Sequence, residues 1–240
     1  MAGRIFITGD KHGTFTPFFG LAEKNDLHPE DVLLITGDAG FVWDETYPKT
    51  IESLEQAFPG TIAFVDGNHE NHDLLNALEV AEWNGGRVHC VGERTFHMMR
   101  GEIFTVHGYK IFAFGGARSS DKNDRRIEGV SWWKAEEPTP EEIAWGTEQL
   151  KRHLPEIDYI ITHEPPLFAR DHVPRKLPLD DDYRLPAVLD EWYALAEAAP
   201  NLKKWYFGHV HTDRKITPKL RAIYNEILQM TEERSIRWWK

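Results

Sequence analysis

Five short clusters of oxygen- and nitrogen-bearing side chains each follow a run of apolar residues. The runs, at residues 4–9, 32–36, 61–65, 159–162 and 204–207, are rich in β-branched and aromatic residues and have the length of strands. The clusters are Asp10-Lys11-His12, Gly37-Asp38, Gly67-Asn68-His69-Glu70, Thr162-His163 and Gly208-His209-Val210-His211. In an open α/β sheet the carboxyl ends of the strands face one rim, where ligands bind. The pattern therefore predicts an α/β fold in which distant clusters converge.

The residue types in these clusters are those of metal ligands. Aspartate, asparagine and histidine offer the oxygen and imidazole donors that small divalent cations bind. A mixture of carboxylate and imidazole suits Mn, Fe, Zn or Ni better than Ca or Mg, which favour all-oxygen shells. The clusters hold more donors than one small cation can use. The sequence therefore predicts a site for two divalent transition-metal ions.

The order of the clusters resembles the signature of the calcineurin-like metallophosphoesterase superfamily, which reads D-x-H, G-D, G-N-H-E/D, a lone His and G-H-x-H. The resemblance extends from Asp10 to His211 and covers most of the chain. It implies a four-layer αββα sandwich with two facing mixed sheets. It also implies two ion sites with Asp38 as the bridge: Asp10, His12, Asp38 and His211 in one, and Asp38, Asn68, His163 and His209 in the other.

The activity that the resemblance implies is hydrolysis of phosphate esters by attack of a hydroxide that bridges the two metal ions. His69 follows the ligand Asn68 directly, and the resemblance makes it the general acid that protonates the leaving oxygen. A purely structural role for His69 is the alternative. The other histidines are expected to be surface or packing residues: His28, His72, His89, His97, His107, His153 and His172.

The second cluster departs from the pattern of the protein Ser/Thr phosphatases and diadenosine tetraphosphate hydrolases of this superfamily. Those enzymes carry G-D-x-x-D-R-G, whereas Gly37-Asp38 is followed here by Ala-Gly-Phe-Val-Trp-Asp at residues 39–44. In those enzymes the aspartate of the motif orients the acid histidine, and the arginine binds the substrate phosphate. This chain has neither residue at the equivalent position. The candidates for orienting His69 are Asp44, Glu70 and Asp73.

A polar and charged stretch at residues 117–138 is too long for a simple connection, since typical loops have about 4–6 residues. It begins at the predicted metal rim and combines Arg and Lys residues with the pair Trp132-Trp133. We expect it to form a wall of the substrate pocket, in which Arg118 and Arg126 neutralise the phosphate or a neighbouring anionic group. A solvated loop whose tryptophans pack onto the body is the alternative, and residues 171–183 would then select the substrate.

The whole chain, residues 1–240, is predicted to form one domain, because no linker-like tract divides it and single α/β domains reach this size. Helical patterns at residues 16–24, 49–58 and 72–83 alternate with the first strands, which predicts a parallel core. Residues 87–115 read as an antiparallel meander that starts a second sheet. Further elements are expected as helices at 140–154 and 184–198 and short strands around 215–216 and 222–224.

The net charge of −11 disfavours long nucleic acid, because duplex DNA is bound mainly through phosphate contacts with basic residues. The charge still allows a local anion site in the basic stretch with Arg118, Lys122, Arg125 and Arg126. No apolar run approaches the roughly 20 residues that span a bilayer, and no signal-peptide pattern opens the chain, so no membrane partner is expected. The single cysteine, Cys90, agrees with a reducing, cytoplasmic location.

These features predict a cytoplasmic phosphoesterase whose substrate is a phosphorylated small molecule, most simply a phosphomonoester, or a phosphoprotein. A metal centre of this kind treats diesters with the same chemistry, so a phosphodiesterase acting on cyclic nucleotides or dinucleotides is the alternative. A non-catalytic metal-binding scaffold is an alternative of another class, although such relatives usually lose a ligand or the acid histidine. The metal identity, the physiological substrate and the oligomeric state do not follow from the sequence.

Overall fold

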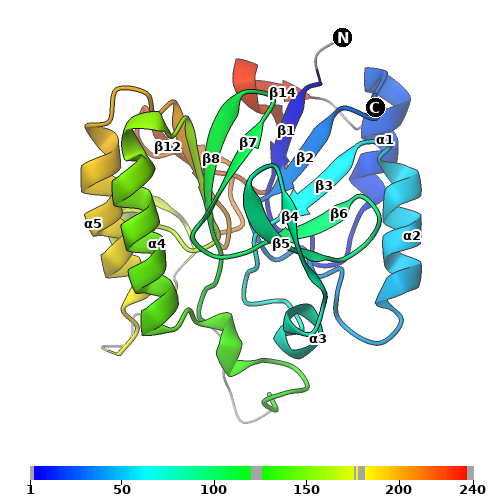
Figure 1. The fold of residues 1–240 in the computed structure, drawn as a ribbon, viewed down its shortest axis with the longest axis horizontal. Helices are drawn as coiled ribbons and strands as arrows, with labels where there is room; N and C mark the ends of the chain where they lie inside the picture. Colours follow the sequence, from blue (N-terminus) through cyan, green and yellow to red (C-terminus); the bar gives the residue numbers. More distant parts are fainter. Residues whose placement is uncertain (1–2, 120–125, 176, 178–181, 237–240) are drawn as a thin grey trace.

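Two mixed β-sheets lie face to face, and helices cover the outer face of each sheet (Figure 1). The computed structural model describes residues 3–119, 126–175, 177 and 182–236. Helices α1 (Thr16–Asn25) and α2 (Tyr47–Ala57) pack on one sheet, and α4 (Pro140–His153) and α5 (Leu185–Glu197) pack on the other. This arrangement confirms the predicted four-layer αββα sandwich.

The first sheet has eight strands in the order β14-β13-β1-β2-β3-β6-β5-β4. Its strands are β1 (Ile5–Thr8), β2 (Val32–Ile35), β3 (Thr61–Phe64), β4 (Val80–Trp83), β5 (Gly86–Cys90), β6 (Thr95–Met98), β13 (Ile227–Gln229) and β14 (Arg234–Ile236). Strands β1, β2, β3 and β6 are parallel, whereas the outer pairs are antiparallel. The register aligns Thr8 with Ile35 and Ile35 with Phe64, so three parallel strands end at one level.

The second sheet has six strands in the order β11-β12-β10-β9-β8-β7. Its strands are β7 (Glu102–Val106), β8 (Tyr109–Phe114), β9 (Tyr159–Thr162), β10 (Lys204–Phe207), β11 (Arg214–Lys215) and β12 (Leu220–Ala222). Strands β8, β9, β10 and β12 are parallel, and the register aligns Phe114, Thr162 and Phe207. The five ligand clusters therefore follow strand ends, as predicted: β1, β2 and β3 in one sheet, β9 and β10 in the other.

Apolar side chains fill the spaces between the layers. Between the sheets, Ile7 and Leu34 belong to one buried cluster with Ile161 of the second sheet. The alternate side chains of the same strands face the helices, as Phe6 does in the cluster that contains Phe18 of α1. Strands buried on both faces have continuous apolar sequences, which is why these strands could be recognised without the structure.

Residues 80–83 form strand β4, so the predicted helix over residues 72–83 was too long. The observed helix α3 covers only His72–Asn76, and β4 pairs antiparallel with β5. The turn between them contains Asn84 and Gly85, both with positive φ (52° and 90°), the conformation that a tight hairpin requires. The pairing of β4 with β5 therefore overrides the helical pattern of this segment.

The second sheet begins at β7, later than the predicted start near residue 87. Strands β5 and β6 belong to the first sheet, because β6 pairs parallel with β3. The remaining helices agree with their predicted ranges to within two residues at each end. Strands β13 and β14, of three residues each, were not predicted.

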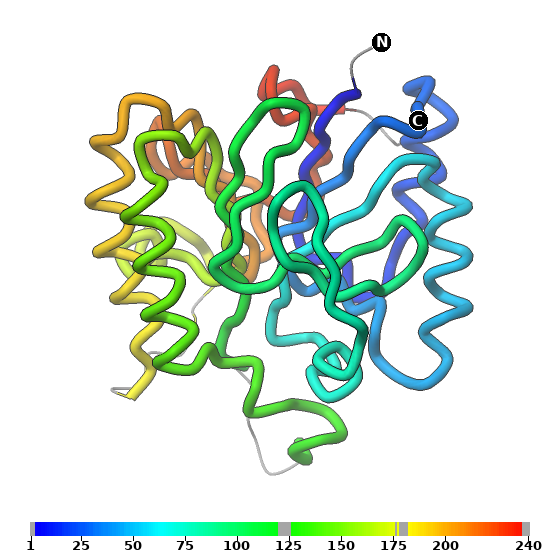
Figure 2. The backbone as a smooth tube through the Cα atoms, in the orientation of Figure 1, coloured from blue at the N-terminus to red at the C-terminus, as the bar shows by residue number. Residues whose placement is uncertain are grey.

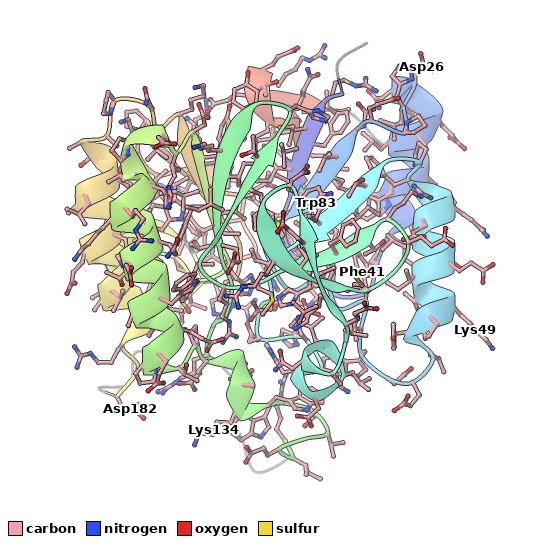
Figure 3. All side chains as sticks on the ribbon, in the orientation of Figure 1. Asp26, Phe41, Lys49, Trp83, Lys134 and Asp182 are labelled. Atoms are coloured by element: carbon pink, nitrogen blue, oxygen red, sulfur yellow. The ribbon has the colours of Figure 1, made fainter. Side chains whose placement is uncertain are left out.

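The described part of the stretch 117–138 protrudes from the rim at which the parallel strands end (Figure 2). It contains the short 3-10 helix η1 (Lys134–Glu136) and lies beside α3, where Trp133 Nε1 donates to Asp73 Oδ2 at 2.9 Å. Trp133 is buried and meets Trp43 edge to face at 5.4 Å between ring centroids. The described part of the stretch, which includes Lys134, lines a cavity of 1090 Å³, and Asp182 lines the same cavity. Figure 3 labels both residues.

Candidate metal centre

Side chains from the ends of β1, β2, β9 and β10 converge into two adjoining groups of possible metal ligands. The first group contains Asp10, His12, Asp38 and His211, and the second contains Asp38, His163 and His209. Within each group the candidate ligand atoms lie within 4.8 Å of one another. Asp38 belongs to both groups, which is the position expected of a bridging carboxylate.

The donors in this centre are crowded. His211 Nε2 lies 3.1 Å from Asp10 Oδ2 and 3.1 Å from His12 Nε2. In the second group, His163 Nε2 lies 3.2 Å from Asp38 Oδ1. Atoms that all carry lone pairs repel one another at such distances unless protons or cations lie between them.

Several buried atoms of the centre lack an aligned hydrogen-bond partner among the described residues. They are Asp10 Oδ2, Asn68 Oδ1, His163 Nε2 and His209 Nε2. Buried polar atoms are nearly always paired, because an unpaired one loses its hydration without compensation. All four atoms are donors to divalent transition metals, so the residues present fit the two ions that the sequence predicts.

Asn68, the asparagine predicted as a ligand, has its side-chain NH₂ group fixed by a hydrogen bond, while its Oδ1 has no aligned partner among the described residues. Asn68 Nδ2 donates to Ser119 Oγ at 3.4 Å, and Ser119 in turn donates to Glu136 through both Oγ (2.7 Å) and its backbone N–H (2.8 Å). Ser119 and Glu136 are buried. Sequence reasoning did not find these two residues, because a serine and a glutamate in a charged stretch carry no distinguishing pattern.

His163 is oriented by the neighbouring strand end. Its Nδ1–H donates to the Thr36 carbonyl at 2.7 Å, so Nε2, which lies 3.2 Å from Asp38 Oδ1, is the nitrogen that could bind an ion after losing its proton. Burial disfavours the charged imidazole, but the Asp38 carboxylate outweighs this effect and raises the pKa of His163 to about 10. Burial, followed by the charge of His163, holds the pKa of His209 well below its usual value. Metal binding therefore has to displace a proton from His163.

The backbone around the centre adopts a conformation that side chains rarely take. His12, Asp38, His209 and His211 all have positive φ, between 47° and 66°. Such residues cost energy and cluster at functional sites, where the surrounding structure maintains them. For Asp38, part of that support comes from Glu70, whose carboxylate accepts the N–H groups of Ala39 (2.8 Å) and Gly40 (3.1 Å).

His69 lies at the edge of the centre. Its backbone N–H donates to Asp38 Oδ1 at 2.8 Å, and its half-buried ring lies 4.9 Å from the His12 ring, measured between centroids. The carboxylates predicted as candidates to orient it all have other partners. Glu70 holds the loop after Asp38, Asp44 accepts from Thr46 N and Oγ1, and Asp73 accepts from Trp133.

The two arginines predicted to contact substrate have partners within the stretch itself or near it. Arg118 donates to both carboxylate oxygens of Glu137 (2.8 and 2.7 Å) and to Asp182 (2.6 Å), and it stacks over Tyr183. Arg126 Nη1 donates to the Ser131 carbonyl at 3.1 Å. Lys122 and Arg125, also named in the predicted anion site, lie outside the described residues.

Arg175 contacts the centre directly and was not singled out from the sequence. Its Nη1 donates to His211 Nδ1 at 2.8 Å. The His211 ring also stacks on Tyr224 at 4.7 Å, and Asp213 fixes Tyr224 by accepting its backbone N–H at 2.8 Å. Arg175 lies between the 3-10 helix η3 (Leu167–His172) and α5, in a segment without periodicity, so no local pattern marked it.

Three histidines predicted as packing residues are buried away from this centre. His89 and His97 contact each other through their Nδ1 atoms at 2.9 Å, and His97 Nε2 meets Asp66 at 3.1 Å. Asp66 also pairs with Arg100, and His72 Nε2 contacts the Gly67 carbonyl at 3.0 Å. This network links β3 to β6 just before the Asn68 cluster and agrees with a packing role.

The fold and the clustered donors define a phosphoesterase-type α/β sandwich with a candidate metal site. The family model for calcineurin-like phosphoesterases matches residues 3–213. The chain therefore belongs to the calcineurin-like phosphoesterase family, as its sequence motifs indicated.

The other comparisons add little to this assignment. Comparison with curated proteins gave no match. Similar solved structures include the sulfate thiohydrolase SoxB of Thermus thermophilus in complex with glycerol, at 12% identity and a TM-score of 0.39. That match covers 87% of this chain but 37% of the SoxB chain, so this chain spans little more than a third of that relative's length. Among the described residues, no helix is long and apolar enough to cross a membrane.

Proposed function

We propose that this metal-dependent phosphoesterase hydrolyses phosphate monoesters of small molecules or proteins with two divalent transition-metal ions. The observation that carries the proposal is the cluster of Asp10, His163 and His209 around the shared carboxylate of Asp38, each with a buried donor atom that lacks an aligned hydrogen-bond partner among the described residues. Family membership supports phosphoester hydrolysis in general. The choice of monoester substrates and of Mn, Fe, Zn or Ni as the ions is our inference.

The ligand roles follow the two groups of side chains. Asp10, His12, Asp38 and His211 would hold one ion, and Asp38, Asn68, His163 and His209 the other. Ions bound there supply Lewis acidity toward the phosphoryl oxygens and toward a water molecule. The chain's own residues orient two of the proposed ligands: Thr36 accepts from His163 Nδ1, and Ser119 accepts from Asn68 Nδ2, so that His163 Nε2 and Asn68 Oδ1 remain as the atoms that could bind an ion.

His69 is proposed to hold and deliver the proton that the leaving oxygen needs. The ring is half-buried beside the centre, and its backbone is anchored on Asp38, so it stays near bound substrate. Histidine is the side chain that most often serves as a general acid, because imidazole can both hold and release a proton. A scaffold without catalysis has no need of a histidine in this place.

The substrate pocket is proposed to include the stretch 117–138, which lines the cavity beside Asn68's partner Ser119. Contact of Arg118 and Arg126 with substrate phosphate belongs to this proposal. A cytoplasmic location, suggested by the single cysteine, also belongs to it and can be tested by cell fractionation.

A hydrolysis panel tests the proposal. Protein reconstituted with Mn²⁺ or Ni²⁺ would be offered an aryl phosphate monoester, a bis-aryl diester, a cyclic nucleotide, a dinucleoside polyphosphate and a phosphopeptide. We expect the monoester and the phosphopeptide to be turned over fastest. The Asp38→Asn variant should abolish turnover, whereas the matched control Glu52→Gln, on the exposed face of α2, should not. Faster turnover of diesters would favour the phosphodiesterase alternative, and no turnover of any ester would refute the proposal.

A further inference from the structure

Arg175 places a positive charge against the candidate metal centre. Its guanidinium Nη1 lies 2.8 Å from Nδ1 of His211, whose other ring nitrogen faces Asp10 and His12. The Arg175 side chain is half-buried, so it is part of the rim and still reachable from outside.

The charge of Arg175 has no carboxylate partner within the described part of the chain. Other buried arginines near the rim have one: Arg118 pairs with Glu137, Arg170 with Glu164, and Arg100 with Asp66. The partner of Arg175 is a single imidazole nitrogen. Since a guanidinium gains most from a charged acceptor with two oxygens, this contact leaves its capacity for a bidentate ion pair unused.

The contact with His211 is also incompatible with His211 as a metal ligand through Nε2. A neutral imidazole that gives Nε2 to an ion carries its hydrogen on Nδ1, which then cannot accept from Arg175. The stack on Tyr224 holds the ring in place, so the side chain that has to find another acceptor is Arg175. The guanidinium lies next to His211, a member of the first ligand group.

We infer that Arg175 is a substrate-binding residue that grips two non-bridging oxygens of the phosphoryl group held at the metal centre. The inference rests on the proposed function and deepens it. The arginine that contacts phosphate in the G-D-x-x-D-R-G motif has no counterpart after Asp38. Arg175, which lies in the segment before α5, would provide that contact in this chain. Because an unsubstituted phosphoryl dianion offers more free oxygens and more charge than a diester, Arg175 favours monoesters.

The test compares Arg175→Ala and Arg175→Lys with the control Arg184→Ala, which removes the same charge at an exposed position of the same segment. The first measurement is the binding of inorganic phosphate to the Mn²⁺-loaded protein by titration calorimetry. Arg175→Ala is expected to weaken binding at least tenfold, Arg175→Lys to recover only part of the affinity, and the control to match the wild type. Metal content and thermal unfolding should be unchanged in all three.

The second measurement is kcat/KM for the aryl monoester and the diester. Arg175→Ala should lower the value for the monoester at least tenfold and that for the diester less. Equal phosphate affinity in wild type and Arg175→Ala overturns the inference, as does absence of phosphate binding to the wild type. A loss of metal in Arg175→Ala that Arg175→Lys restores also overturns it, because Arg175 would then position His211. If phosphate binding depends on Arg175 but no ester is hydrolysed, the inference stands and the proposed function fails.

Discussion

Replacing Ser119 by alanine is expected to weaken metal binding without removing a ligand. Ser119 Oγ accepts from Asn68 Nδ2 at 3.4 Å and donates to Glu136 Oε2 at 2.7 Å. Without the hydroxyl, the Asn68 amide can turn and present its NH₂ group to the centre in place of Oδ1. Loss of such an outer contact typically lowers metal affinity by about 10–100-fold, or about 1.4–2.7 kcal/mol.

The same substitution removes one hydrogen-bond donor from the buried Glu136 carboxylate. A hydrogen bond to a charged group contributes about 1.5–3 kcal/mol. Since 1 kcal/mol changes the Tm of a protein of this size by about 2–4 °C, the metal-free variant should unfold about 3–12 °C below the wild type. The two effects are separable, because only the first one depends on Asn68.

Metal affinity would be measured by competition with a chromophoric chelator, and stability by thermal unfolding of the metal-free protein. Ser53→Ala is the matched control, because Ser53 Oγ donates only to the Lys49 carbonyl on the exposed side of α2. The control should change neither quantity by much. If Ser119→Ala binds both ions with wild-type affinity, Ser119 does not orient Asn68 and the reasoning is wrong.

Four further outcomes are expected. Reconstituted wild type should hold close to two transition-metal ions by elemental analysis and Asp38→Ala far fewer, so unchanged metal content in the variant would contradict a shared ligand. His69→Asn should keep its metal but lose about 10²–10⁴-fold in kcat on alkyl phosphates and less on activated aryl esters, and equal losses would indicate a positioning role. Because Asp38 raises the pKa of His163 from 6.5 to about 10, metal-free protein should lose stability as pH rises from 6.5 through 10. Metal affinity should rise over the same range, and His163→Ala should remove this loss of stability, although Lys11, whose pKa burial lowers to about 8, still titrates. Arg118→Ala should lower kcat/KM at least tenfold if Arg118 binds phosphate, whereas a fall in Tm with unchanged kinetics would assign Arg118 to its ion pairs with Glu137 and Asp182.

The regular part of the fold was accessible from local sequence. Strands β1, β2 and β3 are apolar on both faces and are followed by glycine-containing clusters, so their ends could be placed to within a residue or two. The segment at residues 80–83 was assigned wrongly because its pairing partner, β5, is recognised only through the hairpin that joins them. Local periodicity does not contain that information.

In the candidate site, too, one part could be predicted from the sequence and another part could not. The ligand types and their order were readable, since each lies next to a strand in sequence and the strand ends meet at one rim. The residues that orient the ligands were not readable. Ser119 contacts Asn68, and Arg175 contacts His211, from irregular segments distant in sequence, and Glu136 contacts Ser119 from the short helix η1. No periodicity marks such contacts.

The sequence by itself determined the α/β class and the family and supplied the candidate metal ligands, because these depend on residue type and on short-range patterns. Only the tertiary structure decided how strands β4 to β7 divide between the sheets and which side chains support the donors. It also decided that Arg118 has carboxylate partners whereas Arg175 faces a histidine of the centre. Charge compensation and hydrogen-bond pairing are properties of groups brought together by folding, so they follow from distances in space rather than from spacing along the chain.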